Sequence, residues 1–177
     1  GRVLDHLQAT SQLDNTLIFF LSDNGGCAEW DPWGFDESSG PKNILHTGAD
    51  LKTVGGPKSY ISYGSGWANV SNAPWKLYKH YNHEGGISAP FIAYWPKGID
   101  GHGQLEKEPA HLIDIMATCI DLSGAKFPTE FNGGKTTELH GVSLIPEFHG
   151  QPVNRPYPLF WEHEGNRAIL EGKWKLV

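Results

Sequence analysis

Two short polar clusters in this sequence combine residue types that can do chemistry. The first is Asp23-Asn24-Gly25-Gly26, which directly follows the apolar run 17–21. An Asp carboxylate and an Asn carbonyl are hard oxygen ligands, and they suit Ca²⁺ or Mg²⁺ better than Zn²⁺. A calcium shell needs about 6–8 oxygens, so the remaining ligands would have to come from elsewhere. Taken alone, the same four residues are also a good generic turn.

The second cluster gathers a lysine, two histidines and a glutamate just before another pair of glycines: Lys79, His80, His83 and Glu84 precede Gly85-Gly86. A lysine at the mouth of a sheet can hold an oxyanion such as sulfate or phosphate. Each residue alone has a simpler interpretation as a surface lysine, a structural histidine or a helix cap. The repeated design, a polar cluster with a double glycine beside an apolar strand, favours one shared site.

The elements that must position these clusters can be read from the hydrophobic pattern. We expect a helix over 1–13, a strand over 17–21, a long loop over 25–74 with aromatics such as Trp30 and Trp67, and a second strand over 87–95. A helix is expected over 111–122 with Gly124 at its C-terminus, and antiparallel strands over 159–162 and 168–177. Both early strands are apolar at nearly every position, as in a sheet covered by helices on both faces. The pattern predicts an α/β fold whose mixed sheet is mainly parallel, with a small antiparallel addition.

Composition narrows the classes of partner. The 177 residues carry a formal net charge of −6 with no Lys or Arg run, which disfavours nucleic acid. No apolar run reaches the roughly 18 residues needed to span a bilayer. The chain begins within an expected helix, which indicates a missing N-terminal part. The two cysteines, Cys27 and Cys119, could form one disulfide bond, and the sequence does not decide whether they do.

The order of the motifs resembles the arylsulfatase family. The resemblance rests on the segments 17–26, 63–69, 72–87, 111–115, 139–144 and 161–167. It implies an alkaline-phosphatase-like sandwich, with residues 1–150 in the catalytic α/β domain and 151–177 opening a C-terminal antiparallel subdomain. It also implies that Asp23 and Asn24 bind the catalytic Ca²⁺ and that Lys79 contacts the substrate sulfate. His80 and His83 are expected to be substrate-pocket residues.

One part of the family pattern is absent from this sequence. Sulfatases make a formylglycine nucleophile from Cys or Ser in Cys/Ser-x-Pro-x-Arg, and neither Cys27 nor Cys119 begins that pattern. Ser88-Ala89-Pro90 does begin it, but Ile92 stands at the arginine position. We therefore expect a C-terminal portion of a sulfatase, inactive alone and prone to self-association through an uncovered strand edge. The resemblance implies a sulfated small molecule or glycan as substrate and a periplasmic, secreted or lysosome-like location.

Two other functions stay open at this point. A phosphatase or phosphodiesterase of the same superfamily would usually hold two transition metals and use Asp-His where this chain has Asp23-Asn24. A non-catalytic, aromatic-rich glycan-binding module would need no nucleophile at all. The exact substrate, and whether the nucleophile precursor is Cys or Ser, are not defined by these residues.

Overall fold

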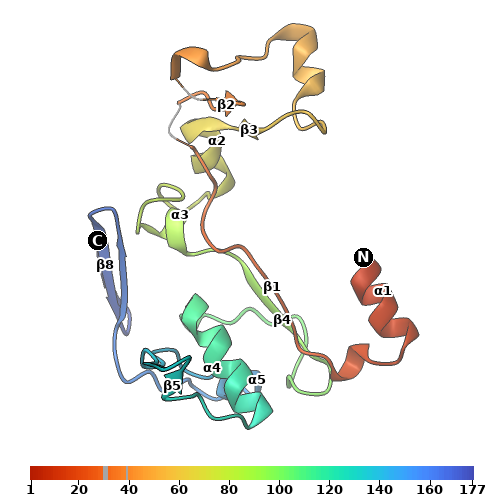
Figure 1. Ribbon diagram of the computed structural model, residues 1–177, viewed down its shortest axis with the longest axis vertical. Coiled ribbons are helices and arrows are strands. Elements are labelled where there is room, and N and C mark those ends of the chain that lie inside the picture. Colours follow the sequence, from red (N-terminus) through yellow and green to blue (C-terminus); the bar gives the residue numbers. More distant parts are fainter. Residues whose placement is uncertain (30–31, 39) are drawn as a thin grey trace. The chain divides into compact units, whose positions relative to one another are not determined.

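The computed structural model describes residues 1–29, 32–38 and 40–177. Trp30, one of the aromatics in the expected loop, lies outside the described residues. The chain separates into two compact units, one built from Gly1–Phe20 and Ile92–Pro158 and the other from Leu21–Phe91 and Leu159–Val177. We call them unit 1 and unit 2 and describe each by itself (Figure 1). The expected domain boundary after residue 150 stays a prediction.

Helices are the main regular elements of unit 1. Its central helix confirms the one expected over 111–122 and ends as expected, because Gly124 takes the left-handed conformation, with a φ of 65°. At its start, His111 and Asp114 form a reciprocal capping box, in which each side chain accepts a hydrogen bond from a backbone N–H. The helices of unit 1 are α1 (Arg2–Ala9), α4 (Leu112–Ser123), α5 (Ile145–Phe148) and the 3₁₀ turn Leu13–Asn15, and its hairpin joins β5 (Glu130–Phe131) and β6 (Gly134–Lys135).

A buried polar network holds the chain against α4. The Asp114 carboxylate, which is fully buried, accepts from the Val142 N–H at 2.9 Å and from the Arg155 guanidinium at 2.6 and 3.1 Å. One turn later, the Thr118 hydroxyl donates to Asp114 O at 2.7 Å and accepts from the Leu144 N–H at 3.0 Å. These bonds satisfy backbone groups of 142–144 that would otherwise be buried without partners.

The Thr118→Val substitution tests this network, because valine keeps the shape and removes the hydroxyl. The Leu144 N–H then loses its acceptor inside the protein, which costs about 1–3 kcal/mol of unfolding free energy. Urea unfolding measures the change. The same substitution at exposed Thr137 is the control and should change stability by less than about 0.5 kcal/mol. Equal stability of the two variants would show that the network is not a source of stability.

Unit 2 contains the segment expected to be a long loop, and that segment holds several short elements. They are β2 (Phe35–Asp36), the 3₁₀ turns Gly40–Lys42 and Gly48–Thr53, β3 (Ile61–Ser62) and α2 (Gly64–Ser71), with β2 and β3 antiparallel. A short helix, α3 (Glu84–Ile87), follows. The expected C-terminal antiparallel strands are confirmed as one three-stranded sheet of β7 (Leu159–His163), β8 (Asn166–Glu171) and β9 (Trp174–Leu176).

The expected mainly parallel sheet is not confirmed. The two apolar strands, β1 (Ile18–Leu21) and β4 (Phe91–Tyr94), pair with each other. Just beyond them Ser22 N–H donates to Pro90 O at 3.2 Å and Gly25 N–H to Gly86 O at 2.9 Å, so these flanking segments run in opposite directions. The second strand also starts later than expected, because 84–87 closes a helical turn through the Ser88 N–H to Glu84 O bond.

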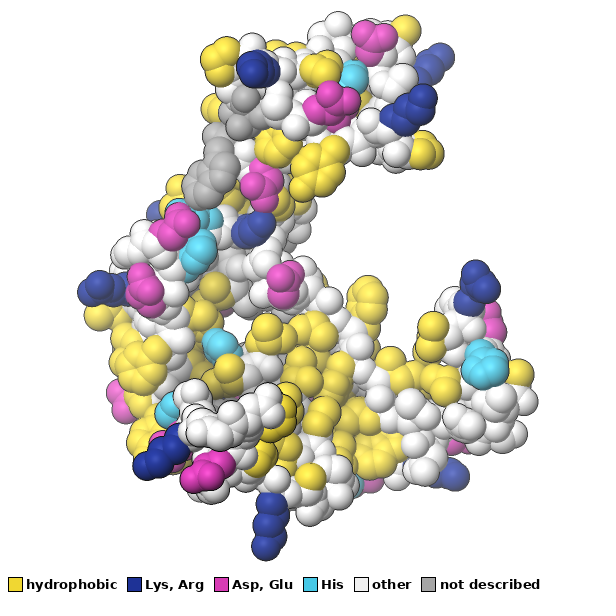
Figure 2. All heavy atoms as spheres, viewed as in Figure 1, with side chains coloured by type: hydrophobic (Ala, Val, Ile, Leu, Met, Phe, Trp, Pro, Cys, Tyr) yellow, Lys and Arg dark blue, Asp and Glu magenta, His cyan; other side chains and the backbone are white. Residues whose placement is uncertain are grey.

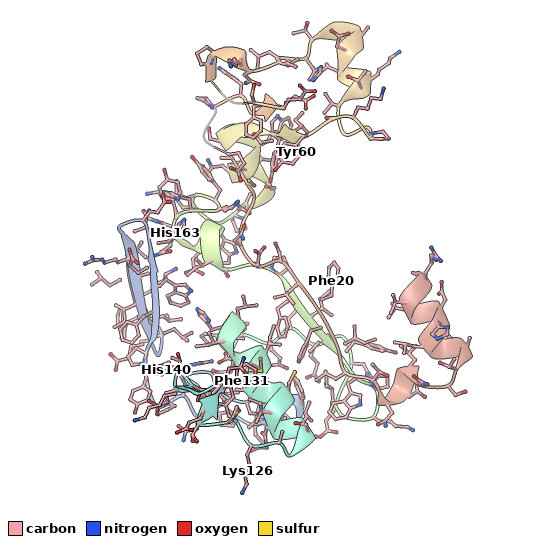
Figure 3. All side chains as sticks on the ribbon, viewed as in Figure 1. Phe20, Tyr60, Lys126, Phe131, His140 and His163 are labelled. Carbon is pink, nitrogen blue, oxygen red and sulfur yellow. The ribbon has the colours of Figure 1, made fainter. Side chains whose placement is uncertain are left out.

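The apolar strands are also less covered than their sequences predict. Phe20 is 72% exposed and Ile92 57% exposed, and Figure 3 shows the Phe20 side chain projecting away from the strand pair. Large hydrophobic side chains elsewhere are exposed too, as the yellow surface of Figure 2 shows. A two-stranded pair offers two faces to solvent, so a fully apolar strand in it stays partly uncovered. Within the part of the chain that the structure describes, no helix is long and apolar enough to cross a membrane.

Candidate functional site

The two double glycines, far apart in sequence, pack against each other in unit 2. Gly25 N–H donates to Gly86 O at 2.9 Å, and a Cβ added to Gly25 would collide with the backbone oxygen of Gly85. A Cβ on Gly86 would collide with Tyr81 O. None of Gly25, Gly26, Gly85 and Gly86 has a positive φ. Gly25, Gly85 and Gly86 are therefore needed because backbones approach closely there, and not because the chain takes a conformation that other residues resist.

Adding a single methyl group tests this close approach. The Gly85→Ala variant places a Cβ against the backbone oxygens of Leu77 and Lys76. Because backbone atoms cannot rotate away, we expect a loss of about 1–3 kcal/mol in unfolding free energy. Gly66→Ala in α2 is the matched control, since a Cβ there meets nothing within 4 Å and alanine favours a helix by about 0.5–1 kcal/mol. Chemical denaturation of both variants should show opposite signs, and two equal shifts would contradict the packing argument.

The Asp23 and Asn24 side chains present oxygen atoms that the rest of the described chain does not use. Asp23 is exposed and Asn24 is half-buried. Ser22 Oγ donates to the backbone oxygen of Asn24 at 2.8 Å, which shapes the turn. Among the described residues, neither the Asp23 carboxylate nor the Asn24 side-chain amide has a hydrogen-bond or ion-pair partner. These two side chains therefore have their oxygen lone pairs available for a cation.

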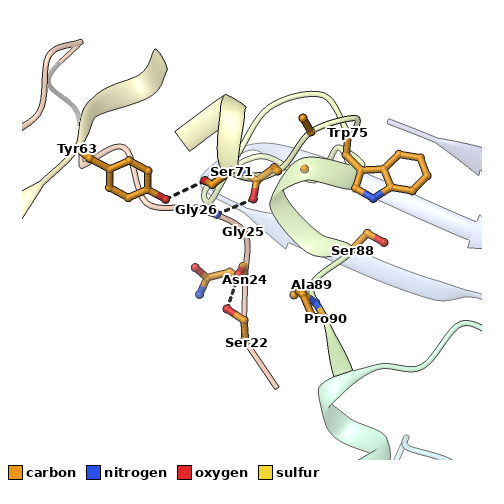
Figure 4. A pocket seen from close by; sticks show the side chains of 13 residues that line it. Ser22, Asn24, Gly25, Gly26, Tyr63, Ser71, Trp75, Ser88, Ala89 and Pro90 are labelled. Atoms are coloured by element: carbon orange, nitrogen blue, oxygen red, sulfur yellow. Dashed lines mark hydrogen bonds between the residues drawn. The ribbon is translucent and has the colours of Figure 1, made fainter. Parts of the chain in front are cut away.

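Asn24 also lines a pocket of about 410 Å³ on unit 2. Figure 4 shows the Asn24 side chain at one side of it and Trp75 and Ser88 at the other. Gly26 fixes part of the wall, since its N–H donates to Asn72 Oδ1 at 2.9 Å. Asp23 is not among the lining residues.

Lys79 lies beside the segment that carries Asp23 and Asn24. Its backbone N–H donates to Gly26 O at 3.0 Å. Gly26 is two residues beyond Asn24, a stretch that spans at most about 7 Å. The Lys79 Nζ donates to Glu29 Oε1 at 2.8 Å and lies 3.7 Å from Cys27 Sγ. The structure thus brings Lys79 to the first cluster across more than fifty residues of sequence.

The charges around Lys79 stabilise its protonated form. The hydrogen bond that Lys79 Nζ donates to Glu29 is the main reason why the pKa of Lys79 is raised. A raised lysine pKa contributes stability that is fully present below the unfolded pKa and is lost as the pH rises through the folded pKa. Burial and the Glu29 carboxylate, which accepts from Cys27 Sγ at 2.7 Å, raise the pKa of the Cys27 thiol. The raised pKa of Lys79 keeps its ammonium group charged at neutral pH.

Sequence reasoning missed Glu29 altogether and considered Cys27 only for a disulfide or a nucleophile. Both Cys27 and Cys119 are free thiols. The one feature that could have indicated Cys27 and Glu29 as site residues is their position close after the first double glycine. Nothing in the sequence predicts that Lys79, fifty residues later, pairs with Glu29.

The two expected pocket histidines have different surroundings. His80 Nδ1 lies 3.5 Å from Glu164 Oε2, and its ring meets His163 edge to face with centroids 5.0 Å apart. His83 precedes α3 as its N-cap residue, and its Nδ1 is buried with no hydrogen-bond partner in the described part of the chain. The structure therefore places His80 against the β7–β8 turn, and the roles of both residues toward a substrate stay predictions.

Comparison with known proteins supports the motif analysis. The sulfatase family model matches residues 1–125. The chain is 33% identical over its whole length to an uncharacterized sulfatase of Schizosaccharomyces pombe, of which it covers 32%, and 34% identical to an arylsulfatase of Klebsiella aerogenes over 81% of the chain and 30% of that protein. It is 28% identical to the N-acetylgalactosamine-6-sulfatase of Rattus norvegicus over 99% of the chain and 26% of that protein. The chain spans about a quarter to a third of the length of these relatives, and it belongs to the sulfatase family.

Proposed function

We propose that this chain is part of a calcium-dependent sulfatase that hydrolyses sulfate esters of aryl compounds or glycans. The observation that carries the proposal is the placement of Lys79 against the segment after Asp23 and Asn24, by a 3.0 Å backbone hydrogen bond to Gly26. A cation site and a lysine ammonium on neighbouring segments can together hold the negatively charged sulfate group of a sulfate ester.

The donor chemistry of the first cluster fits calcium. A carboxylate and an amide carbonyl, adjacent in sequence and without partners among the described residues, are the oxygen ligands that Ca²⁺ prefers. When bound, calcium would supply positive charge to the sulfate oxygens and withdraw electron density from sulfur. Asp23 and Asn24 would hold the ion in place, and other parts of the protein would complete the shell.

Lys79 would stabilise the charge that develops as the ester bond breaks. Its ammonium can donate to the bridging oxygen, which becomes negative as the sulfur–oxygen bond lengthens. The Lys79 Nζ donates to Glu29 Oε1 at 2.8 Å, so a bound sulfate ester would compete with Glu29 for the same ammonium. His80 and His83 are proposed as substrate-pocket residues.

The attacking group is proposed to come from outside these 177 residues, because no Cys/Ser-x-Pro-x-Arg pattern occurs in them. The chain on its own is therefore expected to show no turnover, and its exposed apolar strand pair is expected to promote self-association. A secreted, periplasmic or lysosome-like location follows from the same proposal.

A pair of matched substrates tests the proposal. The full-length gene product is assayed on 4-nitrophenyl sulfate and 4-nitrophenyl phosphate, which differ only in the central atom and its charge. We expect turnover of the sulfate, with kcat/KM at least about tenfold above that for the phosphate. Preference for the phosphate would indicate the phosphatase or phosphodiesterase alternative. Binding of sulfated glycans without turnover of either ester would indicate the glycan-binding alternative.

A further inference from the structure

A second cluster of potential metal ligands lies in unit 2, formed by His80, His163 and Glu164. Each offers one ligand atom, and the three atoms all lie within 4.8 Å of one another. His163 and Glu164 stand at the turn between β7 and β8, where Figure 3 labels His163, and His80 directly follows Lys79. We propose that these three side chains bind one divalent transition-metal ion, and their two imidazoles and one carboxylate select zinc.

The spacing of the ligand atoms fits a shared ion better than a direct hydrogen bond. His80 Nδ1 and Glu164 Oε2 are 3.5 Å apart, whereas two His–Asp pairs elsewhere in the described chain, His46–Asp36 and His149–Asp100, are 2.6 and 2.9 Å apart. Two ligands about 2.1 Å from a tetrahedral zinc ion lie about 3.4 Å from each other. The His80–Glu164 distance is within about 0.1 Å of that edge. The remaining distances are at most 4.8 Å and need a closure of at most about 1.4 Å.

The backbone at two of the three ligands is held in an unfavourable conformation. His80 has a φ of 94°, and Glu164 has a φ of 49°. Glu164 and Gly165, whose φ is 84°, form the two-residue turn of the β7–β8 hairpin, and such turns favour Asn, Asp or Gly at the first position. Backbone strain of this kind clusters at ligand-binding positions. Both strained residues aim a ligand atom at the same place.

Two further contacts hold the β7–β8–β9 sheet against the segment that carries His80. Asn82 Nδ2 donates to Asn166 O at 2.7 Å, and Lys175 forms an ion pair with Glu84. The ligands therefore come from two segments that already contact each other, which reduces the cost of bringing them together. An ion at this position would tie the hairpin to the residue next to Lys79 and so limit the motion of that lysine.

This site differs in chemistry from the one proposed at Asp23 and Asn24. That pair offers only oxygen atoms, which calcium prefers, whereas His80 and His163 offer nitrogen. The inference does not depend on sulfatase activity. Its test needs only metal binding by the folded protein.

Titration with Zn²⁺ and Co²⁺ tests the site. The full-length protein is stripped with a chelator and titrated by calorimetry, and Co²⁺ is added separately to record its visible absorption. We expect tight binding of one Zn²⁺ at this site and the intense visible bands of a four-coordinate Co²⁺ ion. His163→Ala and Glu164→Gln change exposed side chains, and each should weaken binding by more than the roughly 10–100-fold typical of outer-shell partners.

Matched variants separate this site from others. His149→Ala removes an imidazole paired with Asp100 elsewhere in the chain, and Asp23→Asn alters the proposed calcium ligand. Both should retain the zinc binding that His163→Ala and Glu164→Gln lose. Circular dichroism checks that all four variants are folded. Absence of zinc binding, or equal binding in wild type and Glu164→Gln, would overturn the proposal and leave His80 and Glu164 as an ion pair.

Discussion

Replacing Asp23 by Asn in the full-length gene product is expected to lower kcat/KM for a sulfate ester by at least about 10³-fold. The substitution keeps the shape and removes the negative charge that attracts the cation, and a catalytic metal is worth several kcal/mol of transition-state stabilisation. Steady-state kinetics measure the effect, and elemental analysis of the purified protein should show that calcium is lost with activity.

The control is Asp50→Asn, which removes an exposed carboxylate from the Gly48–Thr53 turn. It should leave both activity and calcium content unchanged. If Asp23→Asn retained wild-type activity with a full complement of calcium, Asp23 would not be a ligand.

Replacing Lys79 by Ala is expected to lower kcat/KM by roughly 10²–10³, as for the loss of one strong donor to the transition state. Lys79→Met, which restores length without charge, should do no better. Lys76→Ala is the control on the same segment, because Lys76 is exposed and its backbone oxygen accepts from Gly85 N–H. Full activity in Lys79→Met would show that the lysine contributes packing and not charge.

Local patterns in the sequence were sufficient for several elements. The helix over 111–122, its glycine terminus and the C-terminal antiparallel strands follow from spacing, capping and turn residues within a few positions. The two polar clusters were also found, because each combines unusual residue types with a double glycine. These features depend on residues that are close in sequence, so they can be read from a single sequence.

Contacts between distant segments could not be predicted. The Lys79–Glu29 pair and the approach of His80 to Glu164 depend on which backbones pack together, and hydrophobic periodicity does not encode that. The direction of the segment around Pro90 could not be predicted either, because a continuous apolar run suits parallel and antiparallel pairing alike. The reason for the glycines was likewise hidden, since close approach and positive φ both select glycine.

Calcium titration of the metal-stripped full-length protein, with hydrolysis of 4-nitrophenyl sulfate as the readout, tests the central claim most directly. Turnover in the wild type should be absent without metal and return with Ca²⁺. Lys79→Ala should need the same Ca²⁺ concentration but reach a far lower plateau, and Asp23→Asn should need a much higher concentration. Full turnover without calcium, or the same calcium dependence in wild type and Asp23→Asn, would contradict a calcium-dependent sulfate site at this position.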